Sequence, residues 1–149
     1  MTTLLQEYSW HNEEYFPESK KYQCPPIESS KLDGFLYRFQ MKESPTKNDF
    51  EVATCKSYFR EKNKNHDTVL CQGSGLSSFL SYSDAQESLI RLHANSPGMR
   101  KKFKYIGETK VTPDDGLINK TPSNNTTNHH TYWCKKGSDL LSKTNTKES

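Results

Sequence analysis

Residues 33–40 read Asp-Gly-Phe-Leu-Tyr-Arg-Phe-Gln, and this stretch decides the fold class. Its three aromatic residues recur at a period of two, its residue types favour β-strands, and the Asp-Gly pair in front is typical of a turn. We therefore expect a strand over Phe35–Phe39 that places the three aromatic rings on one face and Arg38 on the other.

Helix patterns lie between this strand and further strand patterns. The clearest begins near Ser83, which forms a capping box with Gln86, and continues through Glu87 and Arg91 at the spacing of an intrahelical ion pair. Asp49 is expected to cap a second helix over residues 50–62. The remaining expected elements are a helix over residues 3–15 and strands near residues 103–106, 117–118 and 131–134.

Several of these strands are joined by turns that are too short for a parallel crossover. The sequence therefore predicts an α+β fold: a single compact domain with a mixed or mainly antiparallel sheet and two to three helices. A chain of 149 residues is enough for one domain, and 8 Tyr, 7 Phe and 2 Trp supply a core although only 31% of the residues are hydrophobic. We expect an N-terminal helix within residues 1–17, the α+β globular domain over residues 33–134 and a disordered polar tail over residues 135–149.

The sequence begins without a basic start followed by an apolar region, and it has no run of roughly 18 apolar residues that would span a membrane. We therefore expect a soluble, cytoplasmic protein with no membrane partner. The four cysteines are far apart and form no Cys-x-x-Cys pair, so no disulfide framework is expected. These cysteines are Cys24, Cys55, Cys71 and Cys134.

The formal net charge of +3 is too small to indicate a nucleic-acid partner by itself, but the basic residues are clustered. Such clusters most often form solvated faces. Nucleic-acid binding through the second cluster remains an alternative. The first cluster is Lys56, Arg60, Lys62 and Lys64, and the second is Arg100, Lys101, Lys102 and Lys104.

A glycine- and serine-rich segment over residues 72–81 precedes the predicted helix at Ser83. Gly73, Ser74 and Gly75 expose backbone N–H groups, so the segment is a candidate site for a phosphate or ribose of a cofactor. It lacks the lysine and the spacing of a P-loop. The alternative is a loop that simply needs glycines before a capped helix.

Two adjacent histidines, His129 and His130, precede the last expected strand. Strand alternation sends their side chains to opposite faces, so one histidine can line a cleft as an acid, a base or a hydrogen-bond donor. Because adjacent histidines on opposite faces cannot share a metal ion, we expect no metal site here. Arg38 is the third candidate, since an arginine on a strand can bind a phosphate or carboxylate with two parallel hydrogen bonds. It can equally be a surface cation.

The order of Leu36-Tyr-Arg38, then Gly75-Leu-Ser-Ser-Phe79, then Asn128-His-His130 resembles small uncharacterised bacterial proteins, over roughly residues 33–134. That resemblance implies a place in bacterial conflict systems. An arginine on a strand followed by a serine-rich segment is also similar to the Arg-Ser-Glu class of ADP-ribosyltransferases. This similarity implies that Arg38 and Ser77 or Ser78 match the first two motifs, and that Glu108 is the acid.

Three functions follow as hypotheses. The first is a macromolecule-binding module, most readily for protein, because opposite-signed patches and exposed aromatic residues suit association. The second is a small nucleotide-using enzyme such as an ADP-ribosyltransferase-like transferase, and the third is nucleic-acid binding. The sequence identifies no cofactor. In the enzyme hypothesis the catalytic candidates are Arg38, Ser77, Ser78, His129 and His130.

Overall fold

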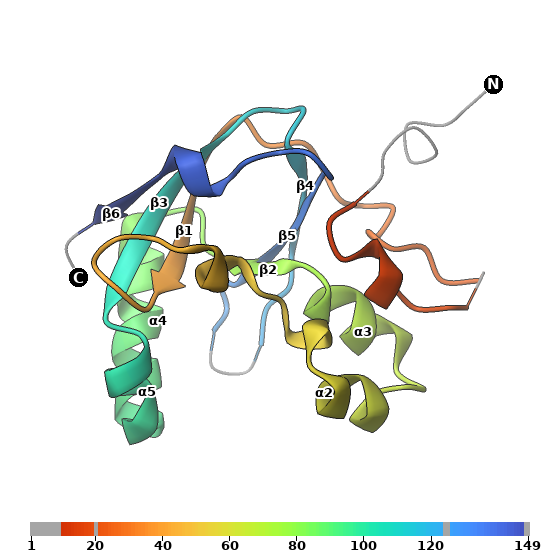
Figure 1. Cartoon of the computed structure of the whole chain (residues 1–149), viewed down its shortest axis with the longest axis horizontal. Helices are drawn as coiled ribbons and strands as arrows, with labels where there is room; N and C mark the ends of the chain where they lie inside the picture. Colours follow the sequence, from red (N-terminus) through yellow and green to blue (C-terminus); the bar gives the residue numbers. More distant parts are fainter. Residues whose placement is uncertain (1–9, 20, 124–125, 148–149) are drawn as a thin grey trace.

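The computed structural model describes residues 10–19, 21–123 and 126–147, and these form two antiparallel sheets (Figure 1). One sheet has the order β1-β3-β6, and the other has the order β2-β5-β4. The strands of the first sheet are β1 (Gly34–Gln40), β3 (Tyr105–Val111) and β6 (Thr144–Lys147). Those of the second are β2 (Leu76–Ser78), β5 (His130–Cys134) and β4 (Gly116–Lys120). The predicted α+β class with antiparallel pairing is confirmed.

A single β-bridge joins the two sheets. The backbone N–H of Tyr37 on β1 donates to the carbonyl of Phe79 at 2.8 Å, and the N–H of Phe79 donates back at 2.9 Å. Phe79 directly follows β2, so this bridge places Arg38 beside the residues of β2.

The predicted alternation along β1 is present, and it separates two different environments. Leu36, Arg38 and Gln40 are buried, whereas Tyr37 and Phe39 are half-buried. The aromatic face packs against the helix α4 (Tyr82–Asn95), whose buried face contains Ala85 and Leu89. The face that carries Arg38 is turned toward β2 and the segment that follows β1.

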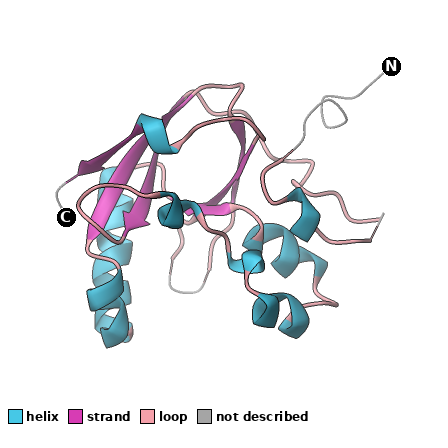
Figure 2. Ribbon diagram, in the orientation of Figure 1, coloured by secondary structure: helices cyan, strands magenta, loops and turns pink. Residues whose placement is uncertain are grey.

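The described residues contain four α-helices, more than the two or three expected (Figure 2). The helix predicted at Ser83 is confirmed as α4, but the capping box predicted for Ser83 and Gln86 is wrong. Ser83 lies inside the helix, and the N-cap is Ser81, whose hydroxyl accepts the N–H of Asp84 at 3.1 Å. The other helices are α2 (Ser57–Lys62), α3 (Asp67–Gly73) and α5 (Pro97–Lys102).

The continuous helix predicted over residues 50–62 is wrong. The chain forms two short 3₁₀ turns, η2 (Lys47–Phe50) and η3 (Ala53–Cys55), before α2. Asp49 is the reason: its carboxylate accepts the backbone N–H groups of Met41 and Thr46, and its carbonyl accepts a hydrogen bond from Arg38. Asp49 is therefore part of η2, where its carboxylate forms a capping box with Thr46, and it does not cap a helix that begins at residue 50.

Both chain ends differ from expectation where they are described. Residues 1–9 of the predicted N-terminal helix lie outside the described residues, and Trp10 pairs with Lys135 before a short 3₁₀ turn, η1 (Glu13–Tyr15). The tail predicted to be disordered instead forms the 3₁₀ turn η4 (Leu141–Lys143) and then β6, which pairs with β3. Hydrogen bonds between side chains fix this edge strand, as between the hydroxyls of Thr109 and Thr144 at 2.7 Å.

Cys24 and Cys71 form a disulfide, contrary to the expectation from their spacing. Cys71 belongs to a buried cluster with Trp10 and Trp133, and the indole N–H of Trp133 donates to the Cys71 carbonyl at 2.9 Å. The disulfide thus ties the irregular N-terminal segment to α3. None of the helices in the described ranges has the length and apolar character needed to cross a membrane.

Candidate functional site

A cleft of about 750 Å³ opens where the two sheets meet the short helices. Its walls come from β1, β2 and β5, from α3 and α2, and from the end of α5, elements that are far apart in the sequence (Figure 1). This volume is in the range of ligand-binding clefts. Three of the sequence-predicted site residues, Arg38, Ser77 and His129, contribute side chains to it, and we call it the Arg38 cleft.

Arg38 is buried at the inner wall of this cleft, with 9% of its surface exposed. Its Nε–H donates to the carbonyl of Ser77 at 2.9 Å, and Nη1 donates to the carbonyl of Asp49 at 2.7 Å. The guanidinium lies 5.0 Å from the ring centre of Phe50. Arg38 forms no ion pair with a described residue, and two of its five N–H groups are used by these bonds.

The charge state of Arg38 follows from its burial. Loss of solvent lowers the pKa of Arg38 to about 10, against an opposite effect of the nearby Asp49 carboxylate. The guanidinium therefore stays charged at neutral pH. The hydrogen bonds of this buried cation go to neutral carbonyls. Among the described residues, the carboxylate that acts on its charge is that of Asp49, which makes no ion pair with Arg38 and accepts two backbone N–H groups instead. The charge is therefore only partly compensated at close range.

Ser77 and His129 form a hydrogen-bonded pair beside Arg38. Ser77 Oγ lies 2.5 Å from His129 Nε2, and His129 Nδ1 lies 3.0 Å from the carbonyl oxygen of Thr121. When Nδ1 carries the proton it donates to this carbonyl, and Nε2 is then the acceptor of the Ser77 hydroxyl proton. A hydroxyl, an imidazole and a group that orients the imidazole form the arrangement that activates hydroxyls in many enzymes.

The surroundings of His129 favour its neutral form. Burial lowers the pKa of His129, and the adjacent His130 lowers it further, while the hydrogen bond to the Thr121 carbonyl acts in the opposite direction. The imidazole also packs edge-on against the ring of Phe79, with 5.8 Å between ring centres. His129 is thus held in one orientation and is available as a base near neutral pH.

Ser78 and His130 do not join this group. The Ser78 side chain is buried on the other face of β2, where its hydroxyl donates to the carbonyl of Leu76 at 3.1 Å. His130 Nδ1 lies 2.9 Å from the carbonyl of Asn128, and His130 does not line the cleft. Adjacent residues along a strand point to opposite faces, so only one of the two serines, Ser77, and one of the two histidines, His129, face the cleft.

The glycine-rich segment is shaped by packing. Gly73 and Gly75 line the cleft, and a Cβ at Gly75 would overlap Thr131 on the neighbouring strand. Ser74 is buried, and its hydroxyl donates to the carbonyl of Leu70 at 2.8 Å. The glycines are thus needed for close approach of the chain to its own neighbours, and the Ser74 hydroxyl is already occupied.

Glu108, the acid implied by the similarity to Arg-Ser-Glu ADP-ribosyltransferases, lies elsewhere. Glu108 on β3 lies opposite Tyr37 on β1, and its Oε2 accepts a hydrogen bond from the Tyr37 hydroxyl with an O···O distance of 2.7 Å. Because Tyr37 and Arg38 point to opposite faces of β1, Glu108 does not reach the cleft. Two other carboxylates line the cleft: Asp49, which is occupied by backbone N–H groups, and the exposed Glu51.

Several cleft residues had no signal in the sequence that linked them to the site. Lys56 precedes α2 and Lys102 ends α5, and both line the cleft together with Phe59 and Phe103. The sequence showed the two basic clusters, but only the fold brings them to opposite walls of one cleft. Lys102 Nζ lies 5.3 Å from the centre of the Phe103 ring.

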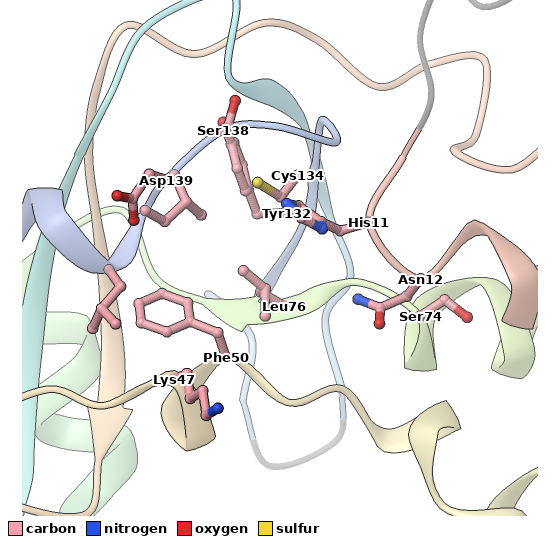
Figure 3. Close-up of a pocket in the computed structure, with 12 residues that line it drawn as sticks. His11, Asn12, Lys47, Phe50, Ser74, Leu76, Tyr132, Cys134, Ser138 and Asp139 are labelled. Carbon is pink, nitrogen blue, oxygen red and sulfur yellow. The ribbon is translucent and has the colours of Figure 1, made fainter.

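A second pocket of about 320 Å³ lies on the other face of β2 (Figure 3). Leu76 lines this pocket whereas its neighbour Ser77 lines the Arg38 cleft. Cys134 also faces it, and burial raises the pKa of this thiol to about 12, so the thiol stays protonated and is a poor nucleophile. No three His, Cys, Asp or Glu side chains in the described part of the chain come close enough together to hold a metal ion.

Comparison with known proteins adds no relative: no family model matches this chain, and no curated protein or solved structure is significantly similar to it.

Proposed function

We propose that this protein is a small nucleotide-using enzyme that binds the phosphates of its ligand at Arg38. The observation that supports this most is the buried guanidinium on the cleft wall, which forms no ion pair with a described carboxylate, while the nearby Asp49 carboxylate accepts two backbone N–H groups. A phosphate is the natural complement, because a guanidinium binds its oxygens with parallel, charge-assisted hydrogen bonds. The proposal is in keeping with the resemblance to Arg-Ser-Glu ADP-ribosyltransferases at Arg38 and Ser77.

Ser77 supplies the contact to the sugar in this proposal. Its hydroxyl proton is directed to His129 Nε2, so its oxygen lone pairs are free to accept a hydrogen bond from a ribose hydroxyl. Ser77 is exposed on the cleft side of β2, and it is next in space to the Arg38 side chain that contacts its carbonyl. Phosphate and sugar contacts thus lie side by side.

His129 supplies the proton acceptor. Its neutral form, favoured by burial, can take a proton from Ser77 Oγ when Ser77 receives one from a hydroxyl bound beside it. The carbonyl of Thr121 stabilises the imidazolium that forms, because it accepts the Nδ1 proton throughout. The reaction class that this geometry suits is transfer of the ADP-ribosyl group of NAD to a hydroxyl. The bond from the anomeric carbon to nicotinamide breaks and nicotinamide leaves, while the acceptor oxygen bonds to that carbon. The acceptor proton passes through Ser77 to His129, with Glu51 as a carboxylate on the cleft wall.

Calorimetric titration with NAD, ADP and inorganic pyrophosphate tests the proposal. We expect the wild-type protein to bind NAD, and Arg38→Lys to weaken this binding at least tenfold because lysine cannot form the paired hydrogen bonds. Arg91→Lys is the matched control, since Arg91 is an exposed arginine on α4 outside the cleft. Circular dichroism establishes that each variant is folded. If folded wild-type protein binds none of the three probes, the cleft is not a nucleotide site.

Protein binding stays a prediction. The large exposed apolar side chains include Tyr58 on α2, Ile90 on α4 and Ile27 in the irregular segment before β1. They mark no single surface in the described part of the chain.

A further inference from the structure

Two basic clusters border the Arg38 cleft on opposite sides. The α5 cluster consists of Arg100, Lys101, Lys102 and Lys104, and the α2 cluster consists of Lys56, Arg60, Lys62 and Lys64. Lys102 and Lys56 line the cleft itself, and Figure 1 shows α5 and α2 separated by the region below β2. Each cluster therefore contributes one lysine to the cleft.

Acidic residues only partly offset this charge. The segment 97–104 has no acidic residue, and the segment 56–64 has one, Glu61. Glu51 is exposed on the cleft wall, and the buried Asp49 carboxylate accepts two backbone N–H groups. Arg60 is partly occupied, because it donates to the Thr54 carbonyl at 2.7 Å, whereas the α5 cluster is fully exposed to solvent.

Aromatic rings accompany the basic residues inside the cleft. Phe59 of α2 and Phe103, which follows α5, line the cleft beside the lysines and are partly exposed. Phe39 and Phe79 lie deeper on the same wall as Phe103, and the centres of the Phe39 and Phe79 rings are 5.7 Å apart. A basic groove with aromatic side chains is how proteins bind single-stranded nucleic acids, because the cations contact phosphates and the rings stack on bases.

We propose that a single-stranded nucleic acid lies with its backbone across the α5 and α2 clusters and presents a hydroxyl to Ser77 and His129, beside the nucleotide that is bound at Arg38. This inference rests on the proposed function, and it deepens it by naming the macromolecule that presents an acceptor to Ser77 and His129. An acidic protein would use the lysines, but it has no need of the aromatic rings.

Fluorescence anisotropy with labelled single-stranded RNA and DNA of about 12 nucleotides tests the inference across roughly 50 to 200 mM salt. We expect affinity to fall steeply with salt. The triple variant Arg100→Ala, Lys101→Ala, Lys102→Ala removes three exposed cations and should weaken binding at least tenfold and reduce the log-log salt slope by about 2. The matched control is Lys31→Ala, Lys110→Ala, Lys136→Ala, which removes the same charge from exposed positions outside the cleft.

The outcomes separate this inference from the proposed function. A flat salt response, an equal loss in both triple variants, or equally tight binding of a polyglutamate peptide overturns the inference, while NAD binding in the calorimeter still supports a nucleotide site. Failure to bind NAD, with oligonucleotide binding lost only in the α5 variant, overturns the enzyme and leaves a strand-binding surface. Binding of either RNA or DNA supports the inference, and a preference for RNA that Ser77→Ala abolishes assigns the sugar contact to Ser77.

Discussion

Gly75→Ala is the sharpest test of how the floor of the Arg38 cleft is built. Gly75 precedes β2, and a Cβ at this position would overlap Cγ2 of Thr131 on β5 and lie 3.1 Å from Nε1 of Trp133. Both neighbours are buried, with 2% of Thr131 and 1% of Trp133 exposed, and the Trp133 indole is fixed by its hydrogen bond to the Cys71 carbonyl. Neither side chain has room to move away.

The magnitude follows from these contacts. Overpacking a rigid core by one methyl group costs about 1–3 kcal/mol, and the rigid partners here favour the upper half of that range. Replacing glycine by alanine restricts the unfolded chain, and this stabilises the folded protein by about 0.4–1 kcal/mol. The free energy of unfolding should therefore fall by about 2 kcal/mol. Gly98→Ala is the control, because nothing lies within 4 Å of a Cβ at this exposed position of α5, and it should be neutral or stabilising.

A second substitution isolates the cause. Thr131→Ser removes the methyl group that the new Cβ would meet and keeps the hydroxyl that lies 2.8 Å from the Thr121 hydroxyl. Alone it should cost about 1 kcal/mol for the lost buried methyl. In the double variant with Gly75→Ala the two effects should fall short of their sum by at least about 1 kcal/mol.

Urea denaturation followed by tryptophan fluorescence measures the stability of the wild type and of the four variants. Additive effects in the double variant would refute the steric account of Gly75, and so would a Gly75→Ala protein as stable as the wild type. A change in the denaturant slope instead of the midpoint would mean that the unfolded state has changed.

Further predictions concern the disulfide, the cleft and two titrating groups. Cys24→Ser should lower the free energy of unfolding by about 4 kcal/mol, from the entropy of a 47-residue loop, and equal midpoints of thermal denaturation with and without reductant would contradict this. Ser77→Ala should change stability by less than about 0.5 kcal/mol, because Ser77 is exposed, but should slow NAD turnover at least tenfold. Since the native pKa of His129 is lowered, the unfolded chain binds more protons below about pH 6.5. Stability should therefore fall as the pH drops from about 6.5 toward the native pKa, and His129→Asn should remove this decline in pH-dependent denaturation. Burial raises the pKa of Asp115, but hydrogen bonds from a lysine and a threonine outweigh it and leave the pKa below its ordinary value. Its stabilisation should be present above about pH 3.9 and vanish as the pH falls through the lower native pKa, and Asp115→Asn should flatten that acid limb.

Sequence patterns that extend over only a few residues predicted the elements that are determined by interactions between residues close together in the chain. β1 follows from the alternation of aromatic residues, and α4 follows from its apolar periodicity and the spacing of the Glu87–Arg91 ion pair, because both signals lie within a few residues. β6 has no such signal. Its Thr-Asn-Thr-Lys sequence is polar, and it becomes a strand because the free edge of β3 accepts it. The disulfide likewise joins residues 47 positions apart, which only the tertiary fold brings together.

The sequence predicted which residue types form the candidate site, but not which of two adjacent residues faces the cleft. Alternation showed that His129 and His130 point to opposite faces, but only the register of β5 with β2, which pairs Ser77 with Thr131, sets which one meets Ser77. Glu108 fails for the same reason, since its partner across the strands is Tyr37, not Arg38. The long-range pairing of strands is therefore the information that the sequence patterns lacked.

The β-bridge between Tyr37 and Phe79 lies beside the cleft at the junction of the two sheets, which also share a buried core that contains Leu36 and Leu76. Arg38 belongs to one sheet, Ser77 and His129 belong to the other, and two backbone hydrogen bonds close the bridge between them. A ligand that contacts both sheets binds only while they stay together, so its binding free energy opposes opening of the bridge. The amide protons of Tyr37 and Phe79 should therefore exchange more slowly with solvent deuterium when a ligand is bound in the cleft, so their exchange rates report ligand binding.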